Sequence, residues 1–251
     1  MSNRQIKAIF RKVRDANLNY HLIENGDRVA VGLSGGKDSF TLLYFLDLLQ
    51  KHTPLLFEIV PIYIDLGWEN EIDSLQDFCK SLGKELIVEK TNIARIVFDI
   101  RREHNPCSLC SNLRRGAMNR VAKRHECNKV ALGHHLDDVV HTLFLSILYE
   151  SRFHVFKPST YLSRMDITMI RPLIYVEERD IRLFVEFMGL KVVKNRCPAD
   201  KLTKRHEVAK ILDQMEAMHP GARRHILASL ENVGPNCFWH PTPKNKPAKP
   251  D

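Results

Sequence analysis

The chain has 251 residues, of which 44% are hydrophobic and 27% are charged, a composition that fits a folded globular protein and excludes wholesale disorder. Lysines and arginines outnumber aspartates and glutamates by 38 to 30, for a formal net charge of +8, which suits a polyanionic partner. No secretory signal and no membrane-spanning apolar run are recognisable, and six cysteines are too sparse for a disulfide scaffold. We therefore expect a cytoplasmic protein without a membrane contact, whose clustered cysteines serve metal or redox chemistry.

Helices and strands are predicted to alternate along residues 4–149. The segment 4–23 has the apolar stripe and the basic face of an amphipathic helix. Strands are then expected at 28–33, 57–65, 85–89 and 129–132, with helices at 42–49, 69–82, 112–124 and 137–149. Because strands that alternate with helices of this length form βαβ units, we predict an α/β fold with a doubly wound, mostly parallel sheet. Ligands of such sheets bind beyond the carboxyl ends of the strands.

The remainder of the chain has a less regular pattern. A last strand is predicted at 167–171, followed by helices at 177–188, 203–218 and 221–233. The N-terminal and C-terminal helices would be additions to the sheet. The segment 241–251 contains four prolines and three lysines and is expected to be a mobile tail.

A polar, glycine-rich segment connects the first predicted strand to the helix that follows it. It comes directly after Leu33 and consists of Ser34, Gly35, Gly36, Lys37, Asp38 and Ser39. Glycines let the backbone turn sharply and approach a ligand closely, and the free N–H groups at a helix N-terminus favour phosphate. The pattern matches neither a Walker A loop nor the G-x-G-x-x-G loop of dinucleotide-binding domains. It therefore predicts a phosphate-binding loop of another type.

A second polar segment follows the fourth predicted strand and opens the next helix. It contains Gly133, His134, His135, Asp137 and Asp138. One aspartate could serve only as a helix cap, but two adjacent carboxylates beside two histidines at a strand end exceed what a cap requires. Paired carboxylates near a nucleotide typically hold Mg²⁺, which neutralises charge on the phosphates. The segment therefore predicts the acidic side of a nucleotide site.

Two of the six cysteines, Cys107 and Cys110, form a C-x-x-C pair that precedes a basic helix. By itself such a pair fits a redox dithiol, half of a zinc site or part of an iron–sulfur cluster. Cys197 lies in a polar loop before a proline, and a Cys-Pro ligand also ends the bacterial ferredoxin run. Three thiolates on a 4Fe–4S cluster would leave one iron open for chemistry. The other cysteines are expected to be structural or to lie near the tail: Cys79, Cys127 and Cys237.

These motifs resemble those of a known family. The segment 34–39 resembles the PP-loop of N-type ATP pyrophosphatases, which split ATP between its α and β phosphates, adenylate an oxygen of the substrate and release pyrophosphate. The segment 133–138 is similar to the G-H-x-x-D-D signature of the members that sulfurate tRNA. With the Pro-Cys-Ser-x-Cys segment at 106–110 and the distant Cys197, the set resembles the tRNA 2-thiocytidine synthetase family.

The resemblance implies a fold, cofactors and partners. The fold would be of the adenine nucleotide alpha hydrolase-like type, and the cofactors would be ATP, Mg²⁺ and a 4Fe–4S cluster. The substrate would be a cytidine in a tRNA anticodon loop, with a sulfur donor system such as a cysteine desulfurase as partner and a homodimer as a candidate assembly. The implied divisions are an N-terminal basic helix (1–25), a PP-loop ATPase domain with an iron–sulfur insertion (26–200), a C-terminal helical segment (201–240) and the tail (241–251).

The resemblance also implies roles for individual residues. Catalysis would involve Lys37, Asp137, Asp138 and Arg114. Nucleotide binding would involve Leu33, Ser34, Gly35, Gly36, Lys37, Asp38, Ser39, Asp65, Gly133 and His134. The cluster ligands would be Cys107, Cys110 and Cys197. Without geometry, a solvated helix face explains Arg114 as well as a phosphate contact does.

Three alternatives stay open at this point. Cys197 is followed by Pro-Ala-Asp, where the best-known branch of the family has Gly-Ser-Gln, so the substrate could be another nucleoside or a small molecule. An amide-forming or lysine-ligating PP-loop enzyme would leave the three cysteines unexplained. A zinc-stabilised RNA-binding module would leave the phosphate loop unexplained.

Overall fold

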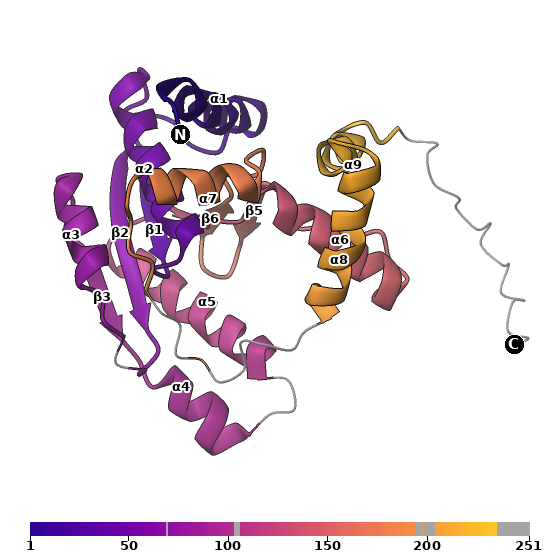
Figure 1. Ribbon diagram of the computed structural model, residues 1–251. Coiled ribbons are helices and arrows are strands. Elements are labelled where there is room, and N and C mark those ends of the chain that lie inside the picture. Colours follow the sequence, from indigo (N-terminus) through magenta and orange to yellow (C-terminus); the bar gives the residue numbers. More distant parts are fainter. Residues whose placement is uncertain (69, 103–105, 194–196, 198–203, 235–251) are drawn as a thin grey trace, which may run out of the picture.

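The structure, a computed structural model, describes residues 1–68, 70–102, 106–193, 197 and 204–234. Within this part of the chain, six strands form one sheet in the order β3-β2-β1-β4-β6-β5 (Figure 1). They are β1 (Arg28–Leu33), β2 (Glu58–Asp65), β3 (Ile87–Lys90), β4 (Lys129–Ala131), β5 (Ser159–Leu162) and β6 (Ile167–Ile170). Neighbouring strands are parallel except for the antiparallel β5–β6 pair. The prediction of an α/β fold with a mostly parallel sheet is thereby confirmed.

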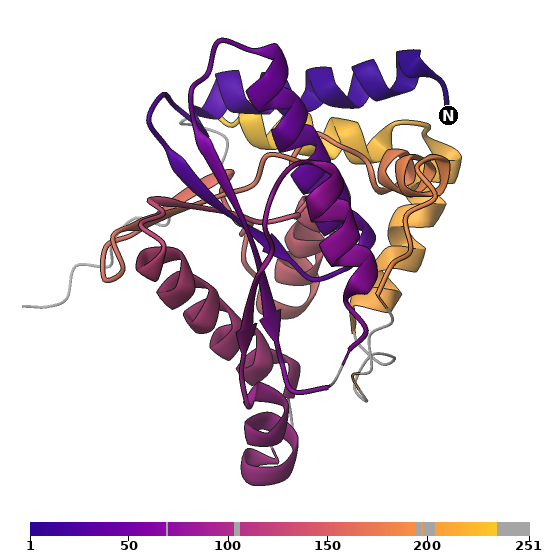
Figure 2. The same ribbon diagram turned by 90° about the vertical axis from the view of Figure 1, so that its left-hand side faces the viewer.

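Helices cover both faces of the sheet (Figures 1 and 2). They are α1 (Asn3–Tyr20), α2 (Lys37–His52), α3 (Asp73–Ser81), α4 (Ile93–Arg95), the π-helix η1 (Ile96–Arg101), α5 (Pro106–Arg124), α6 (Leu136–Glu150), α7 (Glu178–Phe187), α8 (Lys204–Met218) and α9 (Ala222–Glu231). Val29 and Val31 of β1 share one core with α1, α2, α3, α6 and α7. Ala30 shares the other core with α4, η1 and α5. Because successive strand side chains point to opposite faces, β1 supplies both cores.

The strand order reverses between β1 and β4. The chain runs outward from β1 through β2 to β3 in one direction, and β4 and β6 lie on the other side of β1. In open α/β sheets this reversal opens a crevice beyond the strand ends, where ligands bind. The phosphate loop follows β1 and the Gly133–Asp138 segment follows β4. The topology therefore brings both predicted motifs to the same crevice.

Several elements differ from the predictions. The strand β5 is a half-buried edge strand with a polar first half, so its sequence lacks the apolar alternation that would have revealed it. The short α4 and η1 were also not predicted. The helix expected at 69–82 begins at Asp73, while Glu69 lies outside the described residues. The C-x-x-C pair lies inside α5, which begins at Pro106, and does not precede that helix as predicted. A proline fits the first helical turn, where its missing N–H is no loss.

The C-terminal helices α8 and α9 pack against α6, beside the sheet rather than over it (Figure 1). Val208, Leu212 and Leu227 join them to the larger core. The predicted tail at 241–251 and Cys237 lie outside the described residues. Among the helices described, none is both long enough and apolar enough to cross a membrane.

Candidate active site

The phosphate loop is a tight turn between β1 and α2. Gly35 has a φ of +75°, a left-handed conformation that glycine adopts without strain. Gly36 caps α2 in an extended conformation and accepts a hydrogen bond from the Ser39 hydroxyl at 2.8 Å. The Ser34 hydroxyl accepts the N–H of Gly36 at 3.3 Å. The loop thus aims the N-terminus of a sixteen-residue helix at the crevice, which is the arrangement that binds phosphate.

Lys37 is paired with acidic side chains from two elements. Its Nζ lies 3.0 Å from Asp38 Oδ1 and 3.1 Å from Oε1 of Glu178, the first residue of α7. Burial alone would lower the pKa of Lys37, but the charges of Asp38 and Glu178 outweigh it and raise the pKa. Arg182 and Lys37 likewise lower the pKa of Glu178 against the opposing effect of its burial. Glu178 was missed by the sequence analysis, since an acidic residue in a first helical turn is usually explained by the helix dipole.

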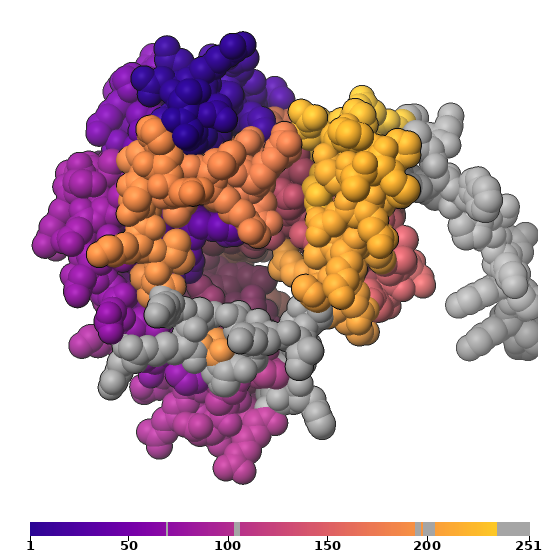
Figure 3. Space-filling view, viewed as in Figure 1, coloured from indigo at the N-terminus to yellow at the C-terminus, as the bar shows by residue number. Residues whose placement is uncertain are grey.

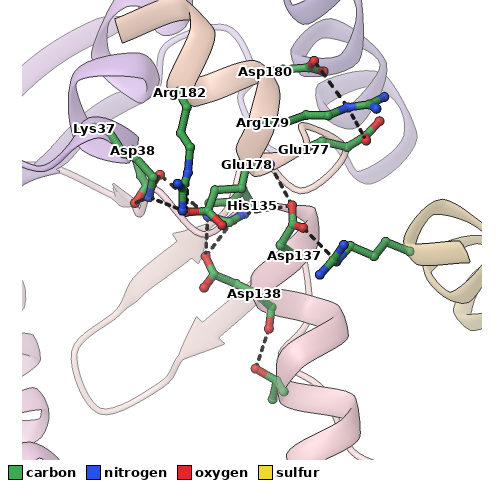
Figure 4. Close-up of polar contacts among 12 residues, drawn as sticks. Lys37, Asp38, His135, Asp137, Asp138, Glu177, Glu178, Arg179, Asp180 and Arg182 are labelled. Atoms are coloured by element: carbon green, nitrogen blue, oxygen red, sulfur yellow. Dashed lines mark hydrogen bonds and ion pairs between the residues drawn. The ribbon is translucent and has the colours of Figure 1, made fainter. Parts of the chain in front are cut away.

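A carboxylate cluster surrounds the buried His135 (Figure 4). Its Nε2 lies 3.6 Å from Asp38 Oδ1 and 3.5 Å from Asp138 Oδ2, and its Nδ1 lies 3.6 Å from Asp137 Oδ2. Burial favours the neutral imidazole, but the contact with Asp137 and the charges of Asp138 and Asp38 together raise the pKa of His135. His135 therefore lies between the acidic groups of the two loops, which favour its protonated form.

The two adjacent aspartates have different surroundings. Asp137 is buried, and its carboxylate accepts the N–H of Glu178 at 2.7 Å and lies 3.2 Å from Nε of Arg223 in α9. Its burial would raise its pKa, but His135, the Glu178 N–H and Arg223 hold the pKa below the usual range. Asp138 is half-buried and lies 2.6 Å from Nη2 of Arg205 in α8. Asp137 is thus bound on both oxygens by the protein, whereas the arginine facing Asp138 is half-exposed.

Gly133 brings the two loops into contact. A Cβ at this position would lie 3.1–3.2 Å from backbone atoms and the Cβ of Asp38. Any side chain here would push the loop after β4 away from the phosphate loop, because this spacing is tighter than ordinary van der Waals contact. The glycine predicted from the motif is therefore required for the close approach of Asp38 to His135.

A cavity of about 450 Å³ adjoins the phosphate loop. In the space-filling view the surface is hollowed between α7, α8 and α5 (Figure 3). Predicted site residues that line the cavity are Leu33, Ser34, Cys107, Cys110, Arg114, His134 and Cys197. Both neighbours of Asp65, namely Ile64 and Leu66, line it as well, but Asp65 does not. The Asp65 carboxylate accepts the N–H of Gly67 at 2.9 Å and so closes the turn after β2.

The three predicted ligand cysteines meet at this cavity although they come from two distant segments. Cys107 and Cys110 lie in the first turns of α5, and Cys197 lies between α7 and α8. Burial raises the pKa of the Cys110 thiol, Arg114 opposes this, and the nearby Cys197 and Cys107 raise it further. Cys79 and Cys127 are buried in the cores, as predicted.

Arg171, which follows β6, also lines the cavity and was not predicted. Its Nε donates a hydrogen bond to Nδ1 of His134 at 3.3 Å, and its guanidinium lies 4.8 Å from the ring centroid of Phe156. Burial and the charge of Arg115 lower the pKa of Arg171 to about 10. Burial, helped by Arg171, lowers the pKa of His134 to about 4. At neutral pH Arg171 is therefore charged and His134 is neutral.

Comparison with known proteins agrees with the presence of a phosphate loop in this site. Residues 2–214 match the PP-loop domain family. The chain is 38% identical over 235 residues to the tRNA-cytidine(32) 2-sulfurtransferase of Geotalea daltonii, covering 91% of this chain and 92% of that protein. The chain belongs to this family of PP-loop sulfurtransferases. Another member, from Bordetella pertussis, is 36% identical over 93% of this chain and 74% of its own length.

Two solved structures are similar in fold to this chain. The U34-tRNA thiolase NcsA from Methanococcus maripaludis, determined with its 4Fe–4S cluster, superposes with a TM-score of 0.76 at 31% identity, covering 91% of this chain and 78% of NcsA. The NH3-dependent NAD synthetase from Campylobacter jejuni has a TM-score of 0.51 at 15% identity, with coverage of 92% and 93%. The second likeness concerns the fold alone.

The donor atoms of this sulfurtransferase fit the two inorganic groups that the family implies. Among the described residues, no three His, Cys, Asp or Glu side chains converge on a point that could hold a single metal ion. A 4Fe–4S cluster does not need such convergence, because each thiolate binds a different iron, and three cysteines line one cavity. Mg²⁺ is commonly held by one or two carboxylates together with substrate phosphates. Asp38 Oδ1 is buried and lies 3.0 Å from Lys37 Nζ, so it can serve as such a ligand in place of its pairing with Lys37.

Proposed function

We propose that this protein is an ATP-dependent tRNA sulfurtransferase that adenylates the C2 oxygen of a cytidine and replaces it with sulfur to give 2-thiocytidine. The observation that carries the proposal is the meeting of Ser34 of the phosphate loop with Cys107, Cys110 and Cys197 in one cavity. A phosphate loop alone fits many ATP-using enzymes, and a trio of cysteines alone fits a structural metal site. The relatives' activity on a tRNA cytidine supplies the substrate class.

The first step is the activation of a poor leaving group. The C2 oxygen of the cytidine attacks the α-phosphorus of ATP, the bond to the β-phosphate breaks, and pyrophosphate leaves. The N–H groups at the start of α2 bind the phosphates, and Lys37 exchanges its pairing with Glu178 for the phosphate oxygens. Charge that develops on the leaving pyrophosphate is thereby stabilised in a partly buried site, where such contacts are strong.

The two adjacent aspartates, Asp137 and Asp138, have different roles in this proposal. Asp137 keeps the start of α7, and with it Glu178, in place through the backbone N–H of Glu178. Asp138, which is paired with Arg205 in the structure, and Asp38 would be the carboxylates that hold Mg²⁺. When bound, Mg²⁺ neutralises charge on the phosphates.

In the second step a sulfur at the oxidation level of sulfide forms a bond to C2, the bond from C2 to the adenylated oxygen breaks, and AMP leaves with that oxygen. Cys107, Cys110 and Cys197, which line the cavity, would hold a 4Fe–4S cluster. When bound, the cluster supplies an open iron position for the sulfur that is transferred. Arg114, one helical turn after Cys110 and exposed at the cavity, contacts a phosphate of the nucleotide or the RNA.

The same proposal names partners and a compartment. The exposed basic residues of α5 bind the tRNA backbone: Arg114, Arg115, Arg120, Lys123 and Arg124. A sulfur donor system such as a cysteine desulfurase supplies the sulfur, and the enzyme works in the cytoplasm, where its tRNA is found. A homodimer is the assembly that we propose.

Mass spectrometry of tRNA nucleosides tests the function directly. A strain that lacks the gene should lose 2-thiocytidine, and a plasmid-borne copy should restore it, whereas a copy with Lys37→Ala should not. Loss of a different thiolated nucleoside would redirect the assignment to another substrate. In vitro, wild type should convert ATP to AMP and pyrophosphate in the presence of tRNA, and the formation of ADP and orthophosphate would contradict the PP-loop chemistry.

A further inference from the structure

The cavity beside the phosphate loop has an unbalanced charge. Its lining includes three arginines, namely Arg114, Arg115 and Arg171, but no aspartate or glutamate of the described chain. The first two lie on the exposed face of α5, where water can screen their charges. Arg171 is different, because it is only 5% exposed. Within the described residues, no carboxylate forms an ion pair with any of the three.

A buried guanidinium without a carboxylate is an unusual arrangement. Arginine keeps its proton under all ordinary conditions, and an unpaired charge inside a protein carries a large desolvation penalty. Arg115 adds repulsion, since its charge is one of the causes that lower the pKa of Arg171. Among the described residues no carboxylate offsets this charge, and an anion in the cavity would stabilise it.

Contacts within the protein fix the orientation of Arg171 without neutralising it. Its Nε donates to His134 Nδ1, its Nη1 donates to the carbonyl oxygen of Lys157, and its plane lies over the ring of Phe156. An arginine has five N–H donors, so these bonds leave others for a ligand. Neutral groups thus hold the Arg171 side chain in place, and its positive charge is retained where it lines the cavity.

The bond from Arg171 also determines which nitrogen of His134 carries the proton. Because Nδ1 accepts the Nε–H of Arg171, the neutral imidazole must carry its hydrogen on Nε2. His134 lines the same cavity. Its N–H is therefore on the nitrogen that faces away from the Arg171 Nε, and the imidazole is not a general base in this state.

We propose that Arg171, held in place by His134, binds a phosphodiester anion in the cavity and is a substrate-binding residue of the thiolation reaction. The inference rests on the proposed function for its ligand. The anion is either the α-phosphate of the nucleotide, which becomes the phosphodiester of the adenylated cytidine, or a backbone phosphate of the tRNA. Ser34 of the phosphate loop lines the same cavity, so a phosphate bound at that loop would lie in the cavity that Arg171 also lines.

Binding measurements on the holoenzyme test this assignment without turnover. The variants are Arg171→Met, which keeps the volume of the stem, and Arg171→Lys, which keeps the charge. Arg28→Met is the matched control, because Arg28 pairs with Glu58 at the amino end of β1, whereas the phosphate loop and the cavity beside it follow the carboxyl end of that strand. Each protein is titrated with an ATP analogue that cannot be cleaved between its α and β phosphates, and separately with an unmodified tRNA transcript.

We expect Arg171→Met to weaken one of the two ligands by roughly tenfold or more, as the loss of a charged hydrogen bond predicts, with partial recovery in Arg171→Lys. Weaker nucleotide binding with unchanged tRNA binding identifies the nucleotide phosphate, and the reverse identifies the RNA phosphate. Thermal unfolding without ligand reports whether each variant is folded. If Arg171→Met does not fold, the same titrations are made with two single variants, Arg171→Lys and His134→Gln.

Unchanged affinity for both ligands in a folded Arg171→Met variant would overturn the proposal. A failure of the proposed function would look different. Wild type would then form no 2-thiocytidine, whereas the effect of Arg171 is read from affinity alone and needs no product.

Discussion

The backbone N–H of Val193 donates a hydrogen bond of 2.9 Å to the carbonyl oxygen of Gly35 in the phosphate loop. The side chain of Val193 covers the same glycine, since a Cβ on Gly35 would lie 2.4 Å from Val193 Cγ2. Cys197 follows Val193 closely in the chain and lines the cavity with the loop. The structure thus ties the nucleotide-binding loop to the segment that carries the third cysteine.

Gly35→Ala should disturb the nucleotide site and the cysteine site together. The left-handed φ of +75° would strain an alanine by about 1–2 kcal/mol, and the new methyl group would displace Val193. We expect weaker ATP binding and a lower iron content in the anaerobically purified protein. Gly26→Ala is the control, because Gly26 has a φ of +85° with nothing near the added Cβ. A Gly35 variant with full iron content would show that the two sites are independent.

Asp137→Asn should mainly lower the stability of the fold, whereas Asp138→Asn should mainly change the dependence of activity on Mg²⁺. Asp137 is buried and accepts the Glu178 N–H, so its loss of charge should lower the free energy of unfolding by roughly 1–3 kcal/mol. The contact of Asp138 with the half-exposed Arg205 should contribute at most about 1 kcal/mol. Pyrophosphate release should fall in both variants, and extra Mg²⁺ should restore it only in Asp138→Asn. Equal losses of stability, measured by urea unfolding, would contradict the division of roles.

Cys197→Ala should lose iron, sulfide and thiolation together while the chain stays folded. Cys107 and Cys110 lie three residues apart on α5, and two thiolates hold a cluster poorly without a third. Cys79→Ala and Cys127→Ala should keep the brown absorbance near ~400 nm, at a loss of about 1 kcal/mol of packing energy each. Cys237→Ala is measured in parallel. A colourless Cys237 variant beside a fully loaded Cys197 variant would transfer the third ligand position to Cys237.

RNA affinity should fall steeply with salt, and Arg114→Ala or Arg120→Ala should flatten the dependence. Both side chains are exposed on α5, and each phosphate contact contributes roughly −0.7 to −0.9 to the slope of log K against log salt concentration. Filter binding at several salt concentrations measures the slope. An identical slope in wild type and in both variants would exclude this helix from the RNA interface.

Much of the site was predictable because its motifs are local. The turn of Gly35 and the start of α2 follow from six consecutive residues between a strand and a helix, and Gly133 with Asp137 follows from a second such run. Local sequence specifies these features because glycine conformation and helix N-termini depend on near neighbours. The edge strand β5 was not predicted, because its strand conformation depends on pairing with β6 and not on its local sequence.

The α/β class, the phosphate loop and the acidic segment could be predicted from the sequence, and the cluster-ligand role of Cys107, Cys110 and Cys197 stays a prediction from it. The tertiary structure, by contrast, shows which charges meet: Glu178 pairs with Lys37 and Arg223 with Asp137, while Arg171 pairs with no carboxylate among the described residues. These partners lie far apart in the chain, and no local propensity or period encodes their distance. Their pairing follows from the strand order, because the reversal between β1 and β4 brings the carboxyl ends of distant strands, and the helices after them, to one crevice.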